Sequence, residues 1–377
     1  MKNDEYDIIA DYFQTEYYLA YEEILKKIGD RIKDIGHMSA SDAHALQQIT
    51  AYGADIQEID AILKKQSKKS QEEMQKIYEE IANNGYEFAA KFYDAKGVLQ
   101  VPISENIPLQ NTLAALLKTG SELMQNFGNT SSIGVVNRRG VFVPFREHYV
   151  RMIDDAVLLV STGVKDYNSA ISSTVKELLN SGIRVKYESG RTRDIYSAVR
   201  MNILDGCNQV WLKTQEECGK QYGSDGFEIS AHGLCAPDHI DIQGRQFTKE
   251  QYNKLNSTLQ RPIGKMNCRH FAFPIVIGVS PPTYTDEELL QVNNLSNAIV
   301  SSGNWSGTRY EASQMMRRYE SRIRQQKAKI AFYTAMGDDA QKTIANKKAR
   351  QLSSEYRAFC ANTGLTQKRN RTSLPKI

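Results

Sequence analysis

Apolar residues recur every three or four positions near the start of the chain, and this spacing predicts one long amphipathic helix over residues 6–32. A stripe so rich in tyrosine is more typical of helix–helix packing than of a binding surface. A second helix is predicted over residues 41–63, and a third is predicted to begin at Ser70, because Ser70 and Glu73 have the spacing of a capping box. Residues 1–108 are therefore expected to form an elongated helical N-terminal arm. The stripe consists of Ile8, Ile9, Tyr12, Phe13, Tyr17, Tyr21, Ile24, Leu25, Ile28 and Ile32.

The middle of the chain is also predicted to be helical. Prolines and a glycine interrupt the helical period over residues 94–108, which marks a first boundary between structural units. A helix is predicted to end near Gly219, and Gly163 and Gly182 are expected to end two earlier helices. A helical middle domain is therefore expected over residues 109–225. Its amphipathic segments before that last helix are residues 111–126, 147–162 and 167–180.

The pattern changes at Gly226, where apolar and polar residues begin to alternate as they do in strands. Residues 227–230 and 271–277 show this alternation, and a turn-rich segment separates them. A small α+β module is therefore expected over residues 226–285, followed by a basic helical region over residues 286–377. The predicted fold is mainly α with a small α+β module, an elongated helical N-terminal part and basic C-terminal helices.

Composition narrows the class of protein. The 377 residues are 41% hydrophobic and 24% charged, which is typical of a water-soluble protein. No apolar run approaches the roughly 20 residues that cross a bilayer, and the first residues lack the apolar core of a signal peptide. We therefore expect a protein made in the cytoplasm, with no membrane contact. Five widely spaced cysteines predict reduced thiols or metal ligands rather than a disulfide framework.

The net charge of +4 conceals a strong asymmetry. Residues 309–371 contain 15 Lys and Arg against 5 Asp and Glu, whereas residues 1–308 contain 32 against 39. The periodicity predicts two helices in the basic region, over residues 310–331 and 340–359. Such a pair would attract DNA or an acidic protein surface. The alternative is a solvated helical pair whose charge serves only solubility.

Potential metal ligands gather in the predicted α+β module, which holds three of the six histidines and two of the five cysteines. His232 and His239 lie in the turn-rich segment, and Cys268 and His270 lie at the start of the second strand. Pairing of the two strands would bring these clusters together and complete a tetrahedral zinc site. These four residues are candidate zinc ligands, and Cys235 is an alternative ligand. The competing interpretation is that the histidines bond to the backbone and that Cys268 packs as a small apolar residue.

Two further kinds of chemistry remain open. Asp238–His239 followed by Asn267 and His270 has the residue order of a histidine-metal nuclease, although the last two residues are too close together for that family. The arginines of residues 191–200 either hold phosphate or pair with acids such as Glu228. The chain has no Walker-type phosphate loop, no Gly-x-Ser-x-Gly elbow and no His-Glu-x-x-His helix. We therefore expect a protein that is not an enzyme.

Several short motifs occur in an order that resembles one phage protein family. They are Ser189–Arg191, Ala198–Met201, Glu228–Gly233, Pro237–His239, Gln243–Phe247 and Asn267–His270. The pattern continues with Tyr310–Gln314, Arg317, Glu320, Ile323, Arg324 and Lys327. In this order they resemble the phage minor capsid protein type 2 family, which is related to the Mu F-like head-morphogenesis proteins of tailed phages. The resemblance covers roughly residues 130–365, and it places a Mu F-like module near residues 226–280.

This resemblance implies a minor structural protein of the phage head, made in the bacterial cytoplasm and incorporated into the virion near the portal vertex. The implied partners are the portal protein and capsid subunits, and the implied role is head morphogenesis with DNA packaging or ejection. A metal-dependent nuclease of the head and a nonspecific DNA-binding assembly factor are the alternatives. The basic helices would contact the portal protein, or packaged double-stranded DNA without sequence preference. The candidate contact residues are Arg317, Arg318, Arg322, Arg324, Lys327, Lys329, Lys347 and Lys348.

Overall fold

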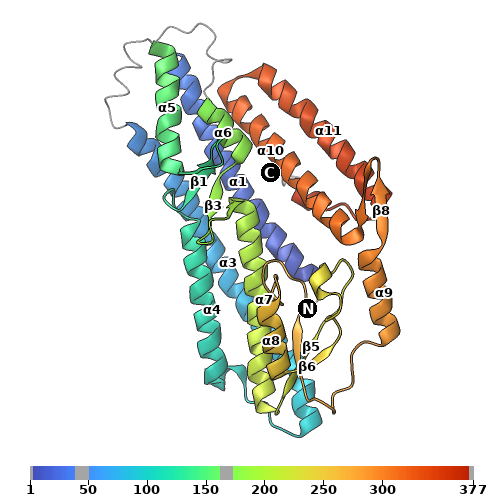
Figure 1. Cartoon of the computed structure of the whole chain (residues 1–377). Coiled ribbons are helices and arrows are strands. Elements are labelled where there is room, and N and C mark those ends of the chain that lie inside the picture. Colours follow the sequence, from blue (N-terminus) through green and yellow to red (C-terminus); the bar gives the residue numbers. More distant parts are fainter. Residues whose placement is uncertain (1–2, 39–50, 162–172, 373–377) are drawn as a thin grey trace.

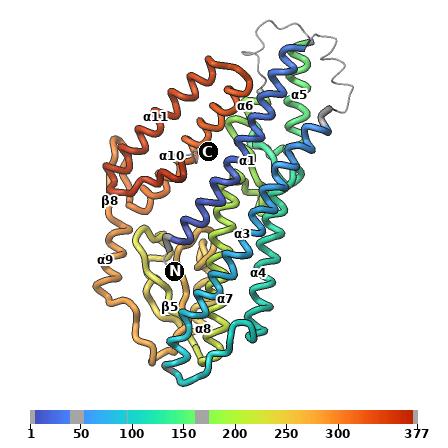
Figure 2. The backbone as a smooth tube through the Cα atoms, turned by 180° about the vertical axis from the view of Figure 1, so that it is seen from behind, coloured from blue at the N-terminus to red at the C-terminus, as the bar shows by residue number. Residues whose placement is uncertain are grey.

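The computed structural model describes residues 3–38, 51–161 and 173–372, and long helices dominate it (Figure 1). Helix α1 packs along α7 and α10, while α3 and α4 pack on α7, so an elongated bundle runs through the molecule (Figure 2). The long helices are α1 (Asn3–Gly36), α3 (Ala51–Lys96), α4 (Ile107–Asn126), α5 (Phe145–Ser161), α7 (Ile195–Gln221), α10 (Arg309–Met336) and α11 (Asp339–Thr363). The short helices are α6 (Ser173–Ser181), α8 (Lys249–Thr258) and α9 (Asp286–Asn297), with 3-10 turns η1 (Ile103–Glu105), η2 (Pro237–His239) and η3 (Arg369–Arg371).

Helix α1 buries most of its predicted apolar stripe, and Phe13, for example, has no exposed surface. Ile8 and Tyr12 are exceptions, because they are 65% and 41% exposed. The first turns of α1 direct Asp7 and Asp11 into the protein instead, and both aspartates are buried. The apolar stripe therefore identifies the packing face along most of the helix but not at its start.

The predicted helix start at Ser70 is wrong, because α3 continues from Ala51 to Lys96. Ser70 is fully buried in the middle of this helix, where its Oγ accepts a hydrogen bond from Gln66 Nε2 at 3.2 Å. The surrounding Lys, Gln and Glu residues favour helix, and α1 and α4 pack against α3. The first part of the predicted second helix, residues 41–50, lies outside the described residues, and residues 51–63 belong to α3.

The predicted helices of the middle region correspond to α4, α5 and α6 where the structure describes them. Gly182 follows α6 with a φ of +66°, a left-handed conformation that ends a helix and suits glycine. The other predicted stop, Gly163, lies outside the described residues. Helix α7 ends at Gln221, close to the predicted end at Gly219.

A β-hairpin that leads directly into a helix recurs along the chain. The units are β1–β2–α5, β3–β4–α7, β5–β6–α8 and β8–β9–α10. In three of them the first helical residue donates its backbone N–H to the residue before the first strand, from Ile195 to Ile183, from Lys249 to Asp225 and from Arg309 to Ala298, at 2.9–3.0 Å. The strands are β1 (Ile133–Val136), β2 (Phe142–Pro144), β3 (Arg184–Lys186), β4 (Thr192–Asp194), β5 (Gly226–Ile229), β6 (Gln246–Thr248), β7 (Ala272–Ile275), β8 (Ile299–Ser302) and β9 (Trp305–Thr308).

Within the described ranges these strands form three antiparallel sheets, in the orders β2-β1-β3-β4, β6-β5-β7 and β8-β9. The four-stranded sheet was not predicted, because strands of three or four residues are too short to show a clear alternation. The β6-β5-β7 sheet with α8 is the predicted α+β module, and its central strand β5 is buried throughout. The fold is therefore mainly α with a small α+β module, as predicted.

The basic C-terminal helices form an antiparallel pair. Helices α10 and α11 pack along each other, and Gly337 joins them in a left-handed conformation with a φ of +78°. The largest apolar core extends from Tyr6 in α1 to Met336 in α10 and includes side chains of most long helices. The predicted domain boundaries after residues 108, 225 and 285 stay predictions. None of the helices in the described ranges is long and apolar enough to cross a bilayer.

Candidate metal centre and cationic cavity

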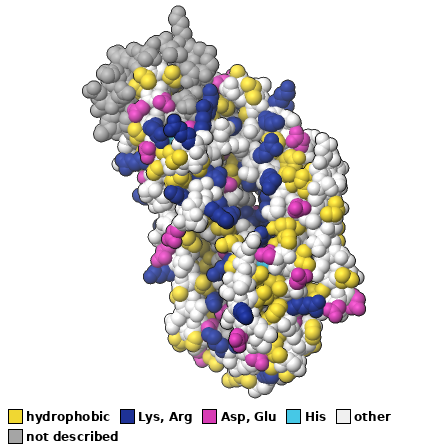
Figure 3. Space-filling model, in the orientation of Figure 1, with side chains coloured by type: hydrophobic (Ala, Val, Ile, Leu, Met, Phe, Trp, Pro, Cys, Tyr) yellow, Lys and Arg dark blue, Asp and Glu magenta, His cyan; other side chains and the backbone are white. Residues whose placement is uncertain are grey.

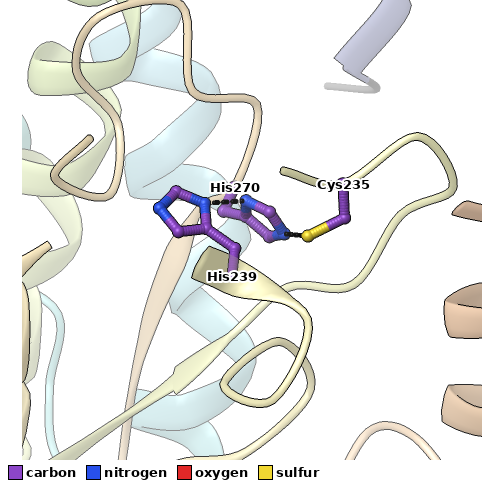
Figure 4. Close-up of side chains that lie close together, drawn as sticks. All are labelled: Cys235, His239 and His270. Atoms are coloured by element: carbon purple, nitrogen blue, oxygen red, sulfur yellow. Dashed lines mark hydrogen bonds between the residues drawn. The ribbon is translucent and has the colours of Figure 1, made fainter. Parts of the chain in front are cut away.

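The pairing of β5 with β7 brings the two predicted His/Cys clusters together. The last residue of β5 pairs with the first residue of β7. The loop that leaves β5 carries Cys235 and ends in the turn Pro237–His239, while Cys268 and His270 precede β7. Side chains from the two loops therefore meet at one end of the sheet, where Figure 4 shows Cys235, His239 and His270 converging.

Three ligand atoms at this end have the spacing of a tetrahedral metal site. The Nδ1 atoms of His239 and His270 are 3.2 Å apart, and Cys268 Sγ lies 3.4 Å from His270 Nδ1 and 3.7 Å from His239 Nδ1. With zinc bonds of about 2.1 Å to nitrogen and about 2.3 Å to sulfur, the ligand atoms of a tetrahedral site are about 3.3–3.6 Å apart. The three atoms therefore approximate one face of such a tetrahedron.

Hydrogen bonds on the outer ring nitrogens assign the tautomers of both histidines. His239 Nε2 lies 2.7 Å from the backbone oxygen of Arg261 and must donate to it, because a carbonyl oxygen only accepts. His270 Nε2 donates to Gln243 Oε1 at 3.1 Å, since that oxygen also accepts the backbone N–H of His232 at 3.0 Å. Both Nδ1 atoms then carry lone pairs that face each other. A cation bound between them would stabilise this arrangement, and a backbone carbonyl on the other ring nitrogen, as at His239, is one of the usual outer contacts of a metal-binding histidine.

Burial determines the charge states of these groups. It lowers the pKa of His232 to about 4 and holds the pKa values of His239 and His270 below their ordinary value. Burial also raises the pKa of Cys235 to about 12 and that of Cys268 to about 11. A neutral imidazole can bind a metal through its free ring nitrogen, whereas each thiol must lose its proton to become a metal ligand.

Cys235 offers a second way to complete a ligand set. Its Sγ lies 3.6 Å from His270 Nε2, whereas Cys268 Sγ approaches Nδ1 of the same ring. The ligand atoms of Cys235, His239 and His270 all lie within 4.8 Å of one another. His232 instead stacks on His270 with ring centroids 4.2 Å apart, and its Nδ1 is 2.7 Å from a backbone oxygen. The structure therefore brings two cysteines and two histidines together and packs His232 beside them.

A cavity of about 810 Å³ opens beside this cluster, and we call it the cationic cavity. Its walls come from β3, β4, α7, the loops that carry the His/Cys cluster, α10 and the segment that follows α11. Among the described residues, ten arginines and Lys368 line it, against the two carboxylates of Asp194 and Glu320. Figure 3 shows Lys and Arg side chains in the middle of the visible face, between the α10–α11 pair and α7. His239 and His270 also line this cavity, so the candidate metal centre faces it.

Two buried aspartates of α1 form ion pairs with some of the arginines that line the cationic cavity. Asp11 accepts from Arg200 Nε at 2.8 Å and from Arg371 Nε at 2.9 Å, and Asp7 pairs with Arg200 and Arg269. Burial raises the pKa of both carboxyl groups, but the facing guanidinium groups outweigh it and leave both pKa values below the ordinary range. The protein thus concentrates fixed charge where α1, α7 and the C-terminal segment meet.

The predicted ion pair of the residue 191–200 segment is present at Arg200, but its partners are the α1 aspartates rather than Glu228. Glu228 accepts hydrogen bonds from Gln246 Nε2 and from the backbone N–H of Thr283. The aspartate partners were not predicted from the sequence, because they lie almost 200 positions away from Arg200 along the chain. The one sequence signal was an acidic pair at i, i+4 spacing beside the apolar stripe of α1.

The predicted C-terminal contact residues do not share one surface. Arg317, Arg318 and Arg324 line the cationic cavity. Lys327 donates to the backbone oxygen of Thr372, and Lys329 donates to a side-chain oxygen of α6 at 2.6 Å. Of the other predicted contact residues, Arg322 and Lys347 are exposed, whereas Lys348 is half-buried and donates to Gln351 Oε1 at 3.2 Å.

Comparison with known proteins agrees with the resemblance seen in the motifs. A search of curated proteins and a search of solved structures each found no match. The family model described as phage minor capsid protein 2 matches residues 3–361, which is nearly the whole chain and includes the α+β module and both basic helices. The chain therefore belongs to the phage minor capsid protein 2 family.

Proposed function

We propose that this protein is a minor structural protein of the head of a tailed bacteriophage, made in the host cytoplasm and built into the virion at the portal vertex. The family match over residues 3–361 carries the proposal. The role is not enzymatic. The chain assists head morphogenesis and DNA packaging or ejection through contacts with the portal protein and capsid subunits.

The α+β module holds a structural zinc ion in this proposal. His239, His270 and Cys268 are the preferred ligands, because their distances of 3.2–3.7 Å fit a tetrahedral face and both Nδ1 lone pairs point into it. Cys235 is the alternative ligand, and because its Sγ approaches Nε2 of His270, a site that uses both atoms would require that nitrogen without its proton. When bound, zinc would tie the loop after β5 to the start of β7, and His232 would support the cluster by stacking on His270.

The outer face of the α10–α11 pair contacts packaged DNA in this proposal. Arg322 and Lys347 are exposed there, and the region from residue 309 to 371 carries a large excess of positive charge. Contacts from such cations to phosphate are independent of sequence and weaken steeply with salt. Cations already bonded within the protein, such as Lys329, contribute less to this surface.

A metal-dependent nuclease is the second candidate function, and one observation favours it. His239 and His270 lie on the wall of a cavity that is lined by arginines, as a site for a phosphate diester would be. A plasmid-cleavage assay separates the candidates. Cleavage that disappears in His239→Ala would support the nuclease, whereas no cleavage by the metal-loaded protein supports the structural role.

Quantitative mass spectrometry of purified phage particles tests the structural role. We expect this protein to remain with the particles at a low copy number relative to the major capsid subunit, in a fixed ratio to the portal protein. The comparison with portal and capsid peptides in the same sample corrects for particle loss. A protein that is abundant in the lysate but missing from particles would contradict the virion assignment.

Metal analysis tests the zinc centre. We expect about one zinc per chain after purification without a metal-binding tag, and a lower melting temperature after chelation. Cys268→Ser and His239→Ala should lose the zinc. The matched control is Cys360→Ser, a buried thiol of α11 outside the cluster, which should keep it. Cys235→Ser distinguishes the two ligand sets, and zinc-free protein with an unchanged melting temperature under chelator would refute the centre.

A further inference from the structure

We propose that the cationic cavity binds an extended acidic segment of a partner protein. The inference rests on the proposed function only for the class of partner, another protein of the phage head. The binding itself is a property of this chain. It therefore can be tested apart from incorporation into particles.

The charge of the cavity is only partly neutralised within the protein. Glu320 is already engaged, because its Oε1 accepts the Tyr356 hydroxyl at 2.8 Å. Asp7 and Asp11 lie outside the lining and form ion pairs with three of the lining arginines, Arg200, Arg269 and Arg371. Most of the guanidinium groups in this part of the described chain therefore have no carboxylate of their own.

Several lining arginines bond only to neutral groups among the described residues. Arg184 donates to the hydroxyl and the backbone oxygen of Thr192, at 3.2 and 3.1 Å. Arg261 donates to the Tyr310 hydroxyl at 2.9 Å. Neutral acceptors orient a guanidinium but leave its charge uncompensated, and burying such a charge is costly. A ligand that carries several negative charges would remove this cost.

The half-buried Arg317 is the clearest case, and the exposed Arg318 follows it in α10. Both line the cavity, and neither side chain forms a hydrogen bond or an ion pair with the described residues. Burial, together with the neighbouring guanidinium groups of Arg200 and Arg371, lowers the pKa of Arg317 to about 9 and outweighs the opposing effect of the Glu320 carboxylate. An incoming carboxylate would reverse this effect, because it favours the charged guanidinium.

The volume argues against duplex DNA in the cavity. About 810 Å³ falls within the roughly 300–1,000 Å³ range of sites that enclose small ligands or a few residues of peptide. A B-DNA duplex, whose major groove alone is about 12 Å wide, is too large to enter. The occupant is therefore a single chain or a small molecule.

The composition of the lining favours a peptide over a nucleic-acid strand. Proteins bind single strands by stacking bases on aromatic rings. Among the described residues, Tyr310 is the one Phe, Tyr or Trp side chain in this lining, and its hydroxyl accepts a hydrogen bond from Arg261. Leu234, Met316 and Leu365 add apolar contacts between the arginines. Planar guanidinium groups bind carboxylates in a two-point fashion, so alternating acidic and apolar side chains match this wall.

Fluorescence anisotropy with the full-length chain tests the proposal. The probe is a short labelled peptide of alternating glutamate and leucine, compared with the same peptide carrying glutamine in place of glutamate. Unlabelled short oligothymidylate and inorganic pyrophosphate serve as competitors. We expect salt-sensitive binding of the glutamate peptide, no binding of the glutamine peptide and weak competition by both phosphate compounds. Tighter binding of either phosphate compound would overturn the assignment to an acidic protein segment.

Substitutions locate the binding. Arg318→Gln removes an exposed cation of the cavity with little risk to folding, and we expect about tenfold weaker peptide binding. Arg317→Gln should act in the same direction. The matched control is Lys347→Gln with Arg350→Gln, which removes two exposed cations of α11 outside the lining and should leave the affinity unchanged. An equal loss in the control would show that overall charge, not the cavity, attracts the peptide, and the absence of any binding would also refute the proposal.

Discussion

The buried ion-pair network leads to a sharp prediction about stability. Arg200 contacts Asp11 at 2.8 Å and also pairs with Asp7, and all three side chains are only 5–6% exposed. Arg200→Met keeps most of the side-chain volume but leaves both carboxylates with fewer cationic partners. Removing one partner of a buried ion pair costs about 3–5 kcal/mol. Since Asp11 keeps Arg371 and Asp7 keeps Arg269, we expect the lower end, about 3 kcal/mol.

Urea unfolding at neutral pH, followed by circular dichroism, measures this loss. The matched control is Arg350→Met, an exposed arginine of α11 that should change the free energy of unfolding by less than about 0.5 kcal/mol. Asp11→Asn in the Arg200→Met background should recover part of the loss, because it removes one uncompensated charge. The coupling free energy between the two substitutions should be about 1–3 kcal/mol.

The network also predicts a pH dependence with a defined sign. The pKa values of Asp7 and Asp11 are lower in the folded protein than in the unfolded chain. The stabilisation is therefore fully present above the unfolded value, about 3.9, and is lost as the pH falls through the folded values. The difference between the wild type and Arg200→Met should shrink in that acidic range. A loss below about 1 kcal/mol at neutral pH, or strict additivity with Asp11→Asn, would refute this account of the network.

Two other positions test the packing and the charge of the core. Gly206→Ala would place a methyl group 1.8 Å from the Tyr78 hydroxyl, so we expect the free energy of unfolding to fall by about 1–3 kcal/mol. Tyr78→Phe should restore part of this loss. In the control Gly53→Ala, the added methyl group meets nothing within 4 Å, so the substitution should be tolerated. Burial lowers the pKa of His148 below 6.5, so stability should be complete above pH 6.5 and fall as the pH drops from 6.5 towards the folded pKa. His148→Gln should flatten this part of the stability–pH curve in thermal melts, and an unchanged slope would contradict a role for His148.

The helices were predictable where one face is continuously apolar and the signal is local. In α1 the three-and-four spacing identified most of the buried face, although Ile8 and Tyr12 are exposed. The capping-box spacing at Ser70 gave a wrong helix start. The same residues are stable inside a helix when the serine hydroxyl forms a hydrogen bond, here with Gln66. The short strands of the four-stranded sheet lacked enough residues to reveal a period.

The candidate site was predictable in its residues but not in its arrangement. The sequence places His239, Cys268 and His270 near two strands that alternation predicts, whereas the pairing of those strands is seen only in the structure. Which ring nitrogens face each other depends on hydrogen bonds to Gln243 and to the backbone of Arg261, and nothing local in the chain specifies them. The exclusion of His232 from the converging ligand atoms likewise depends on stacking that only packing sets.

The sequence by itself determined the local features of this protein: its helical character, its α+β module, its basic C-terminal region and its family. These follow from periodicity, composition and motif order over short stretches of chain. Only the tertiary structure decided that Asp7 and Asp11 meet Arg200 and that arginines from distant segments enclose one cavity. The physical reason is that buried charge pairs act across space between residues far apart in sequence, so their partners are chosen by packing rather than by any local pattern.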